Sequence, residues 1–326
     1  MVGVASFDST VSLWDVSKVG IVSFSVKLSG QENEVKGICF SSSGEELAMC
    51  SRDKSIWIYD VSCLLDRSKG GSVDFQKVDS GQTEEEGEFV FPTSPSVVHR
   101  PSIKGEDCEC LAVLQGHSQD VKSIQFNPHD LHMLVSVSYD DSIKIWRSTC
   151  ADDWELSETL RGHSGTVWDV AFNPQNPNEF ATVSADGSLK IWSNKIPTCP
   201  IPTSSSYLLT GPVGLSTRHH QRTNAFSPVT ESWSCQTIQI TSSCVENIPP
   251  APIYSIDWSP EGLIAVACGD NTVRVILHKP SCNIPISTFK TDSEPNSVSF
   301  NPAGGRELAA GFDDGSISIF NIANVE

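Results

Sequence analysis

Six segments of this chain repeat one short pattern, and this repeat is the feature that most restricts the possible folds. Each segment has a tight turn around an aspartate, then an alternating strand that ends in an aromatic or aliphatic residue. The segments are ASFDSTVSLWDV from Ala5, CSRDKSIWIYDV from Cys50, VSYDDSIKIWRS from Val137, VSADGSLKIWSN from Val183, ACGDNTVRVILH from Ala267 and AGFDDGSISIFN from Ala310. The recurring acids are Asp8, Asp53, Asp140, Asp186, Asp270 and Asp313. No helical periodicity runs across these segments, so the pattern predicts an all-β fold.

A second element precedes most of the six segments. Examples are GHSQDVKSIQFNP at Gly116, GHSGTVWDVAFNP at Gly162 and IYSIDWSPEG at Ile253. Several neighbouring aspartates are separated by roughly the 40–45 residues of a WD40 repeat. With its Gly-His start and Trp-Asp end, the repeat resembles the WD40 family over most of the chain. The resemblance implies a β-propeller, in which four-stranded antiparallel blades stack around an axis because one blade cannot bury both of its faces alone.

The resemblance also implies a buried hydrogen-bonded network in the well-preserved repeats. In one repeat the network would contain His117, Asp140, Trp146 and a serine, for which we take Ser138, with Ser136 as the alternative. The next repeat would place His163, Asp186 and Trp192 in the same way. A His–Ser–Asp set could also suggest a hydrolase triad, but its recurrence in successive repeats favours a structural role. Other repeats have lost parts of the pattern: Gln31 replaces the histidine, and Tyr59, Ile276 and Phe320 replace the tryptophan.

The number of repeats predicts an incomplete ring. The family propeller has seven blades, whereas the repeats here account for about five to six. Residues 1–28 supply only the later strands of one blade, and the last repeat stops near Ile322. We therefore expect a single propeller domain over residues 1–326 that lacks the first blade and part of the second, through an N-terminal truncation that is natural or comes from a faulty gene model. Such a ring would leave sheet edges and apolar faces open.

Two insertions interrupt the repeats. Residues 62–107 contain SKGGS, the acidic EEEGE and several prolines, and residues 194–232 contain PTCPIPTSSS and RHHQR. Their composition predicts long loops, although each interval is long enough to contain a decayed blade. His219 and His220 are adjacent, which is not a metal-ligand spacing, and we interpret them as a surface pair.

Composition narrows the classes of function. The formal net charge is −18, and an acidic surface repels phosphate backbones, so we expect no nucleic-acid partner. The chain has no apolar run of transmembrane length and no signal peptide, so we expect no membrane association. The eleven cysteines are then expected to be reduced thiols in a cytoplasmic protein, with the nucleus as a second location. Cys108 and Cys110 form a CxC without a second pair, so we predict no metal and no cofactor.

Particular blocks narrow the resemblance further. The stretch ENEVKGICFSSSGEELAMCSRDKSIWIYDV from Glu32 resembles the WD40 family of cytosolic iron–sulfur protein assembly, as do SVSYDDSIKIWR, LRGHSGTVWDVAF and ACGDNTVRV. General WD40 repeats do not require Arg52, Tyr139 or Trp168, which these blocks contain. The resemblance implies a non-catalytic scaffold in the complex that delivers iron–sulfur clusters to cytosolic and nuclear apoproteins. Its implied partners are a helical-repeat adaptor, a small partner subunit and the client apoproteins.

Binding residues are expected at one face of the ring. In WD40 repeats, the residue before the turn aspartate and the residue after the first strand's opening valine both point to the top face. Applied to this chain, the two positions predict partner contacts by Arg52, Lys36, Tyr139, Lys122, Trp168, Phe7 and Phe312. The lysines could equally be solvated surface charges. Arginine and aromatic residues often dominate interface energetics, so we expect a basic and aromatic patch that grips an acidic partner segment.

Two other classes of function remain as alternatives. The chain could be a general WD40 adaptor, such as a ubiquitin-ligase substrate receptor or a signalling scaffold, because the fold serves many pathways. It could also be an enzyme, since some propellers hydrolyse substrates in their central channel. An enzyme would need acids or metal ligands that converge on the axis, whereas the repeat aspartates are already used by the structure.

Overall fold

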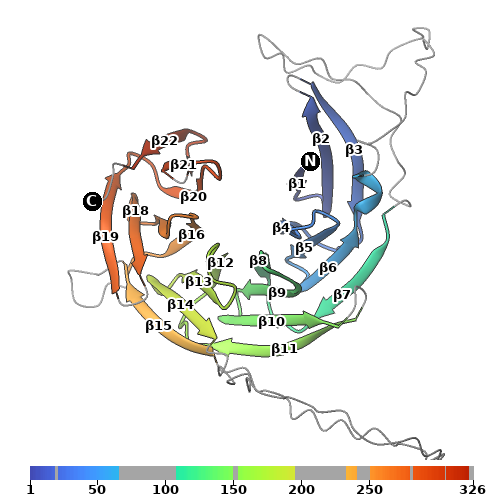
Figure 1. The fold of residues 1–326 in the computed structure, drawn as a ribbon, viewed down its shortest axis with the longest axis horizontal. Coiled ribbons are helices and arrows are strands. Elements are labelled where there is room, and N and C mark those ends of the chain that lie inside the picture. The colour runs from blue at the N-terminus through green and yellow to red at the C-terminus, as the bar shows by residue number, and fades with distance from the viewer. Residues whose placement is uncertain are drawn as a thin grey trace, which may run out of the picture.

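Six antiparallel sheets make up the described part of the chain. The computed structural model describes residues 1–18, 21–65, 108–149, 153–194, 233–240, 250–279, 282–304 and 306–322. The sheets follow one another along the sequence, and Figure 1 shows them arranged around a common axis as the blades of a propeller. The all-β propeller with about five to six blades is therefore confirmed, with six blades present.

The first three blades run from the N-terminus to Arg161. Blade 1 contains β1 (Val2–Ala5), β2 (Thr10–Lys18) and β3 (Ile21–Ser29). Blade 2 contains β4 (Val35–Phe40), β5 (Glu46–Ser51), β6 (Ser55–Asp60) and β7 (Cys110–Gln115), with the short 3-10 helix η1 (Ser62–Leu64) after β6. Blade 3 contains β8 (Val121–Asn127), β9 (Asp130–Ser138), β10 (Ser142–Ser148) and β11 (Trp154–Arg161).

The last three blades complete the described chain. Blade 4 contains β12 (Val167–Phe172), β13 (Glu179–Ser184), β14 (Ser188–Asn194) and β15 (Trp233–Gln239). Blade 5 contains β16 (Ile253–Trp258), β17 (Leu263–Cys268), β18 (Thr272–Lys279) and β19 (Cys282–Lys290). Blade 6 contains β20 (Pro295–Phe300), β21 (Glu307–Phe312) and β22 (Ile317–Asn321). No helix in the described residues is long and apolar enough to cross a membrane.

The same hairpin turn joins the second and third strands of a full blade. In blade 2, Asp53 accepts a hydrogen bond from the backbone N–H of Ser55 at 2.9 Å, and Lys54 between them has φ 75°. A turn aspartate that binds the backbone two residues later stabilises such a turn, and the residue between must tolerate the left-handed region. In the other blades this residue is Ser9, Asp141, Gly187, Asn271 or Gly315, all with positive φ.

The turn in blade 6 lies one residue later than the sequence predicted. Ser316 donates its backbone N–H to Asp314 at 2.9 Å, so Asp314, and not Asp313, is the turn aspartate. Phe312 consequently pairs with Pro295 as the last residue of β21, as Ser138 pairs with Val121 in blade 3. The two adjacent aspartates, Asp313 and Asp314, had hidden this shift in the sequence pattern.

The hydrophobic core consists of layers between neighbouring blades. Between blades 3 and 4, Ile143 and Ile145 pack with Val167, Val170 and Phe172. Equivalent clusters fill the other four junctions from blade 1 to blade 6. Most of the stabilisation by apolar burial therefore depends on contacts between adjacent sheets.

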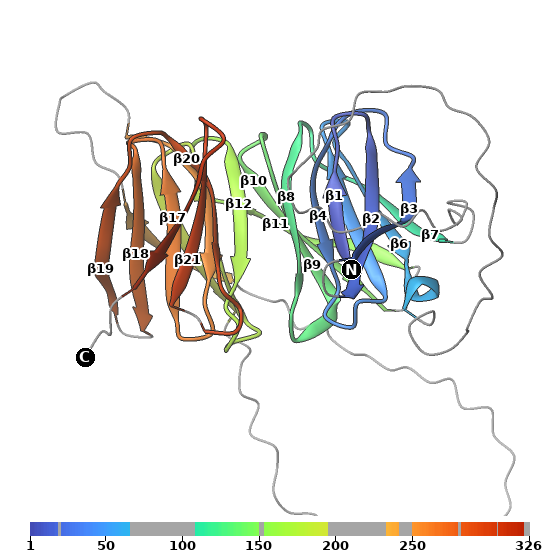
Figure 2. The ribbon, with the colours of Figure 1, turned by 90° about the horizontal axis from the view of Figure 1, so that it is seen from above.

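The arc of blades is open between its two ends (Figures 1 and 2). At one end Ile317 on β22 is 75% exposed, whereas Ile143, at the equivalent position of β10, is 1% exposed because blade 4 covers it. At the other end Val2 and Val4 on β1 are also exposed. The expected open apolar faces are thus present on the two terminal blades. Most of the two predicted insertions, residues 66–107 and 195–232, lies outside the described residues.

Candidate functional site

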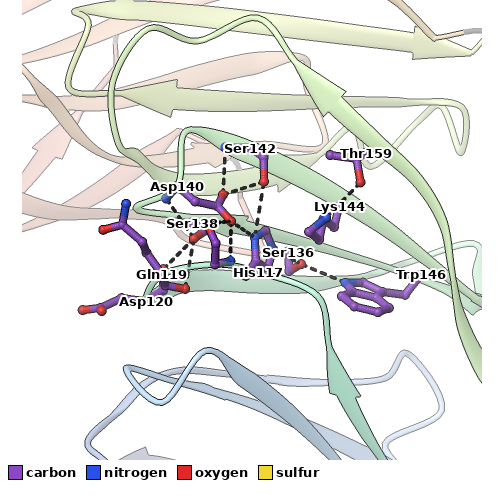
Figure 3. Close-up of polar contacts among 11 residues, drawn as sticks. His117, Gln119, Asp120, Ser136, Ser138, Asp140, Ser142, Lys144, Trp146 and Thr159 are labelled. Carbon is purple, nitrogen blue, oxygen red and sulfur yellow. Dashed lines mark hydrogen bonds and ion pairs between the residues drawn. The ribbon is translucent and has the colours of Figure 1, made fainter.

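A buried polar network links strands β9 and β10 of blade 3 to the segment before β8 and to the turn between β9 and β10 (Figure 3). Asp140 Oδ2 lies 3.0 Å from His117 Nδ1, and His117 Nε2 lies 2.8 Å from Ser136 Oγ. Trp146 Nε1 donates to the same Ser136 hydroxyl at 2.8 Å. This geometry fits a neutral imidazole that donates through Nδ1 and accepts at Nε2 from the serine hydroxyl.

Ser136 is therefore the serine of this network, which corrects the assignment of Ser138. Successive residues of a strand point to opposite faces, but Ser136 and Ser138 share a face, so the sequence alone could not separate them. Ser138 lies at the end of β9, where its hydroxyl donates to the carbonyl of Asp120 at 2.8 Å and accepts the backbone N–H of Asp140 at 3.1 Å. The Ser138 hydroxyl thus stabilises the turn between β9 and β10, and it is not the serine bound to His117.

Blade 4 repeats the network with threonine in place of serine. His163 Nδ1 lies 3.0 Å from Asp186 Oδ2, and its Nε2 lies 2.8 Å from Thr182 Oγ1, to which Trp192 Nε1 donates at 2.9 Å. In blade 2, Gln31 occupies the histidine position and donates its side-chain N–H to the carbonyl of Met49 at 3.1 Å. Two adjacent blades contain the same Asp–His–hydroxyl–Trp network, and the histidine side chains have no exposed surface. The network therefore has a structural role, and we call it the blade brace.

Burial sets the protonation of these groups. It lowers the pKa of His117 and His163 below the ordinary value, against the opposing effect of the paired aspartates. For Asp140 and Asp186 burial acts to raise the pKa, but hydrogen bonds from the histidine and from Ser142 or Ser188 hold it well below the usual range. The neutral histidine and ionised aspartate are thus the resting state.

These shifts predict that acidification destabilises the protein. His117 and His163 bind fewer protons in the folded state than in the unfolded chain, so the free energy of unfolding falls as the pH drops through about 6.5. Each histidine contributes at most about 1.4 kcal/mol per pH unit. Below about pH 4 the two aspartates add to the loss, because their lowered pKa stabilises the folded state only while they are ionised.

Urea unfolding at intervals from pH 7.5 to pH 5 would measure this effect. Burial also acts to lower the pKa of His278, but its ion pair with Glu179 at 3.3 Å raises it on balance, so His278 opposes the trend. The double variant His117→Gln, His163→Gln should flatten the pH dependence, since Gln31 shows that glutamine fits this position. His278→Gln should steepen it. An unchanged slope in the double variant would contradict the assignment.

A β-bulge in the first strand of blades 2 to 6 shapes the top face of the arc. The strand pairing shifts register at Lys36, Lys122, Trp168, Tyr254 and Asn296. A bulge bends the strand and re-aims the side chain of the extra residue. The turns before the third strands reach the same end of each blade, as the hydrogen bond from Arg52 N to Glu34 O shows at 3.1 Å.

Cations and aromatic rings meet along this end of blades 1 to 5. Lys36 Nζ lies 4.9 Å from the centre of the Phe7 ring, and Lys122 Nζ lies 5.2 Å from that of Tyr139 and 5.1 Å from that of Trp168. Trp168 meets Tyr254 edge to face at 5.7 Å. We call this set the cation–aromatic surface: Phe7, Lys36, Arg52, Lys122, Tyr139, Trp168 and Tyr254.

Acidic side chains partly neutralise its cations. Glu34 Oε1 lies 3.1 Å from Lys36 Nζ and 3.2 Å from Arg52 Nη1, and this contact with Lys36, aided by Arg52, lowers the pKa of Glu34 to about 2. Asp120 Oδ2 lies 3.4 Å from Lys122 Nζ. Two cations share Glu34, so this triad has one excess positive charge, whereas Glu294 contacts Tyr254 at the blade 5 end of the surface.

The structure brings together six of the seven side chains predicted to contact partners. Phe7 is 83% exposed, Tyr139 48% and the Arg52 side chain 58%, so each can be contacted directly. Phe312 is the exception: it is 7% exposed and packs in the core between blades 5 and 6. The one-residue shift of the turn explains this error and places Asp313 at the predicted top position, where its backbone N–H donates to Glu294 O at 3.0 Å.

Tyr254 belongs to the surface but was missed from the sequence. It follows Ile253, the opening aliphatic residue of β16, and the rule that selected Lys36, Lys122 and Trp168 would have found it. Among the described residues, no group of three or more His, Cys, Asp or Glu side chains could hold a metal ion. His219 and His220 lie outside the described residues.

The propeller of aspartate-turn repeats is characteristic of WD40 proteins, and comparison of the sequence with protein families supports this class. A family model described as WD domain, G-beta repeat matches residues 23–60, 108–147 and 154–193, which cover most of blades 2, 3 and 4 and β3. A second model, described as Eukaryotic translation initiation factor eIF2A, matches residues 204–326. The chain is a WD40-repeat β-propeller protein.

Within this class the chain is similar to curated proteins named "Probable cytosolic iron-sulfur protein assembly protein 1". The relative from Sclerotinia sclerotiorum is 30% identical over 273 residues, which cover 77% of this chain and 48% of the relative. That from Chaetomium globosum is 32% identical over 145 residues (40% and 25%), and that from Vanderwaltozyma polyspora is 30% identical over 175 residues (46% and 50%). The matched part of this chain spans half or less of each of these relatives.

Proposed function

We propose that this chain is a non-catalytic scaffold of cytosolic iron–sulfur protein assembly. The observation that carries the proposal is the similarity to relatives named for this process, which in one case extends over 77% of the chain. The WD40 architecture supports a scaffold because it offers a rigid arc of exposed turns for protein contacts. The implied location is the cytosol, with the nucleus as a second site of its clients.

The cation–aromatic surface is the proposed contact site. Its exposed arginine, tyrosine and phenylalanine are residue types that supply binding free energy at interfaces, and the excess cation of the Lys36–Glu34–Arg52 triad suits an acidic or carboxylate-bearing partner segment. The structural use of His117, Asp140, His163 and Asp186 in the blade braces argues against their use in hydrolysis. The proposed partners are a helical-repeat adaptor, a small partner subunit and iron–sulfur client apoproteins, without nucleic acid or membrane.

Affinity purification from cytosol with mass spectrometry tests the proposal. Recovery of iron–sulfur assembly factors would support it. Recovery of cullin components instead would favour the alternative, a general WD40 adaptor such as a ubiquitin-ligase substrate receptor. No enrichment of iron–sulfur assembly factors over a control propeller would refute the proposed function.

A charge reversal at Arg52 tests the contact site. Arg52→Glu should abolish capture of these partners, a loss of at least about 2 kcal/mol in binding, because it places a second carboxylate beside Glu34 at the centre of the surface. The melting temperature should stay within about 2 °C, since Arg52 is an exposed side chain. Lys27→Glu is the matched control: Lys27 is similarly exposed and pairs with Asp8 on blade 1, outside the surface. Equal capture by both variants would rule out the surface as the contact site.

A further inference from the structure

Two cysteines of blade 2 lie in contact although 45 positions separate them in sequence. Cys63 Sγ and Cys108 Sγ are 3.5 Å apart. Cys63 belongs to η1, directly after β6, and Cys108 lies two residues before β7 begins at Cys110. The pair therefore marks the point where the chain leaves blade 2 after β6 and returns to form β7.

The surrounding structure holds both thiols in place. Asp60 donates its backbone N–H to Glu109 O at 2.8 Å, and Tyr59 pairs with Cys110, so the outgoing and returning segments are fixed side by side. Cys108 is buried in the cluster between blades 1 and 2, against which Cys63 packs. The contact thus lies between two anchored segments rather than between two loose side chains.

We propose that Cys63 and Cys108 are a redox modification site, in which a peroxide oxidant converts the two thiols into an intrachain disulfide. The sulfur atoms are at van der Waals distance, and an approach of about 1.5 Å would bring them to the length of a disulfide bond. This inference concerns the isolated chain and does not depend on the proposed scaffold function.

The two oxidation steps follow the usual order for a pair of neighbouring thiols, of which the more exposed one reacts first. The more accessible Cys63 attacks hydrogen peroxide as a thiolate, the O–O bond breaks, and Cys63 becomes a sulfenic acid while hydroxide leaves. The Cys108 sulfur then attacks the sulfenic sulfur, the S–S bond forms and the S–O bond breaks. In sum, two thiols lose two electrons and two protons, and one peroxide is reduced to two waters.

Cys110 provides a matched control. It is exposed and lies in the same segment, but its sulfur points to the carbonyl of Ala112 at 3.8 Å. If oxidation followed exposure alone, Cys110 would react in preference to the more buried Cys108. If oxidation instead depends on the contact between the two sulfur atoms, Cys63 and Cys108 form the disulfide and Cys110 remains a thiol.

Peptide mapping of the purified full chain tests the site. The reduced protein is treated with one equivalent of hydrogen peroxide, alkylated under denaturing conditions without reductant, and digested with trypsin. Cleavage at lysine and arginine releases Cys63 in residues 55–67 and Cys108 in residues 105–122. We expect these two peptides to be linked in the wild type and in Cys110→Ser, and to separate after reduction by dithiothreitol. The thiol count should fall from eleven by two in the wild type.

Thermal stability offers a second measurement of the same disulfide. A bridge over this loop constrains the unfolded chain, so the oxidised wild type should melt a few degrees higher than the reduced wild type. Cys63→Ser and Cys108→Ser should show no difference between peroxide-treated and untreated samples. The proposal is overturned if the linked peptides are absent from the wild type, or if their linkage is lost in Cys110→Ser.

Discussion

Phe180→Ala should lower the free energy of unfolding by about 3–5 kcal/mol, the largest effect that we expect from a single core substitution. Phe180 on β13 is fully buried between blades 3 and 4. Its ring centre lies 4.9 Å from that of Trp233, 5.5 Å from that of Phe172 and 6.4 Å from that of Trp192. Three rings on different strands cannot all collapse into the space that the phenyl group leaves, so a cavity should remain.

Urea denaturation followed by tryptophan fluorescence would measure the loss, because Trp192 and Trp233 lie against the substituted side chain. Phe7→Ala is the matched control: it removes the same ring from an exposed position and should cost about 0.5–1 kcal/mol, the value of its contact with Lys36. A loss below about 1 kcal/mol for Phe180→Ala would show that the blade junction repacks, and would contradict the tight core described above.

Asp186→Ala should cost about 3 kcal/mol, the second largest effect. Asp186 accepts from His163 Nδ1 and from the backbone N–H of Ser164, both at 3.0 Å, and from the backbone N–H of Ser188 at 2.9 Å. Alanine would leave these donors without their acceptor in a largely buried site. The cost is then mainly the desolvation of the remaining groups and not the loss of one hydrogen bond.

Asp8→Ala tests whether the loss of stability in Asp186→Ala comes from the blade brace around His163 or from the hairpin turn that Asp186 stabilises. Asp8 holds the equivalent turn of blade 1, where it accepts from Thr10 N at 3.1 Å and pairs with Lys27, with its side chain about half exposed. Water can replace these partners, so the melting temperature should change much less than for Asp186→Ala. Similar changes in both variants would mean that the turn, rather than the histidine network, carries the stability.

The sequence was sufficient to predict the repeated blades, but it was insufficient to predict the exact register of individual turns and side chains. The turn aspartates and alternating strands predict the blades because both patterns arise from local backbone preferences. The position of Phe312 depends on which of the adjacent Asp313 and Asp314 makes the turn, and a shift of one residue turns an exposed side chain into a core side chain. The choice of Ser136 over Ser138 depends on which hydroxyl lies within hydrogen-bond distance of both His117 and Trp146. Spacing in the sequence does not give these distances.

The cation–aromatic surface was predictable only in part. Lys36, Lys122 and Trp168 were chosen by their position after an opening valine, and the bulge that directs them upward follows from strand pairing. The sharing of Glu34 by Lys36 and Arg52 joins a first strand to a turn and appears only in the folded blade. Such contacts combine residues far apart in sequence, so local patterns cannot supply them.

The open arc has a thermodynamic consequence. Each blade is stabilised by its immediate neighbours, and in the described part of the chain blades 1 and 6 each pack against one neighbouring blade. We then expect the blades to unfold like a short linear array of repeats, with local unfolding that starts at both ends. A closed ring would instead be expected to unfold in one cooperative transition. Amide protons of β9 and β13 in the middle should exchange with solvent most slowly, and those of β1 and β22 most rapidly.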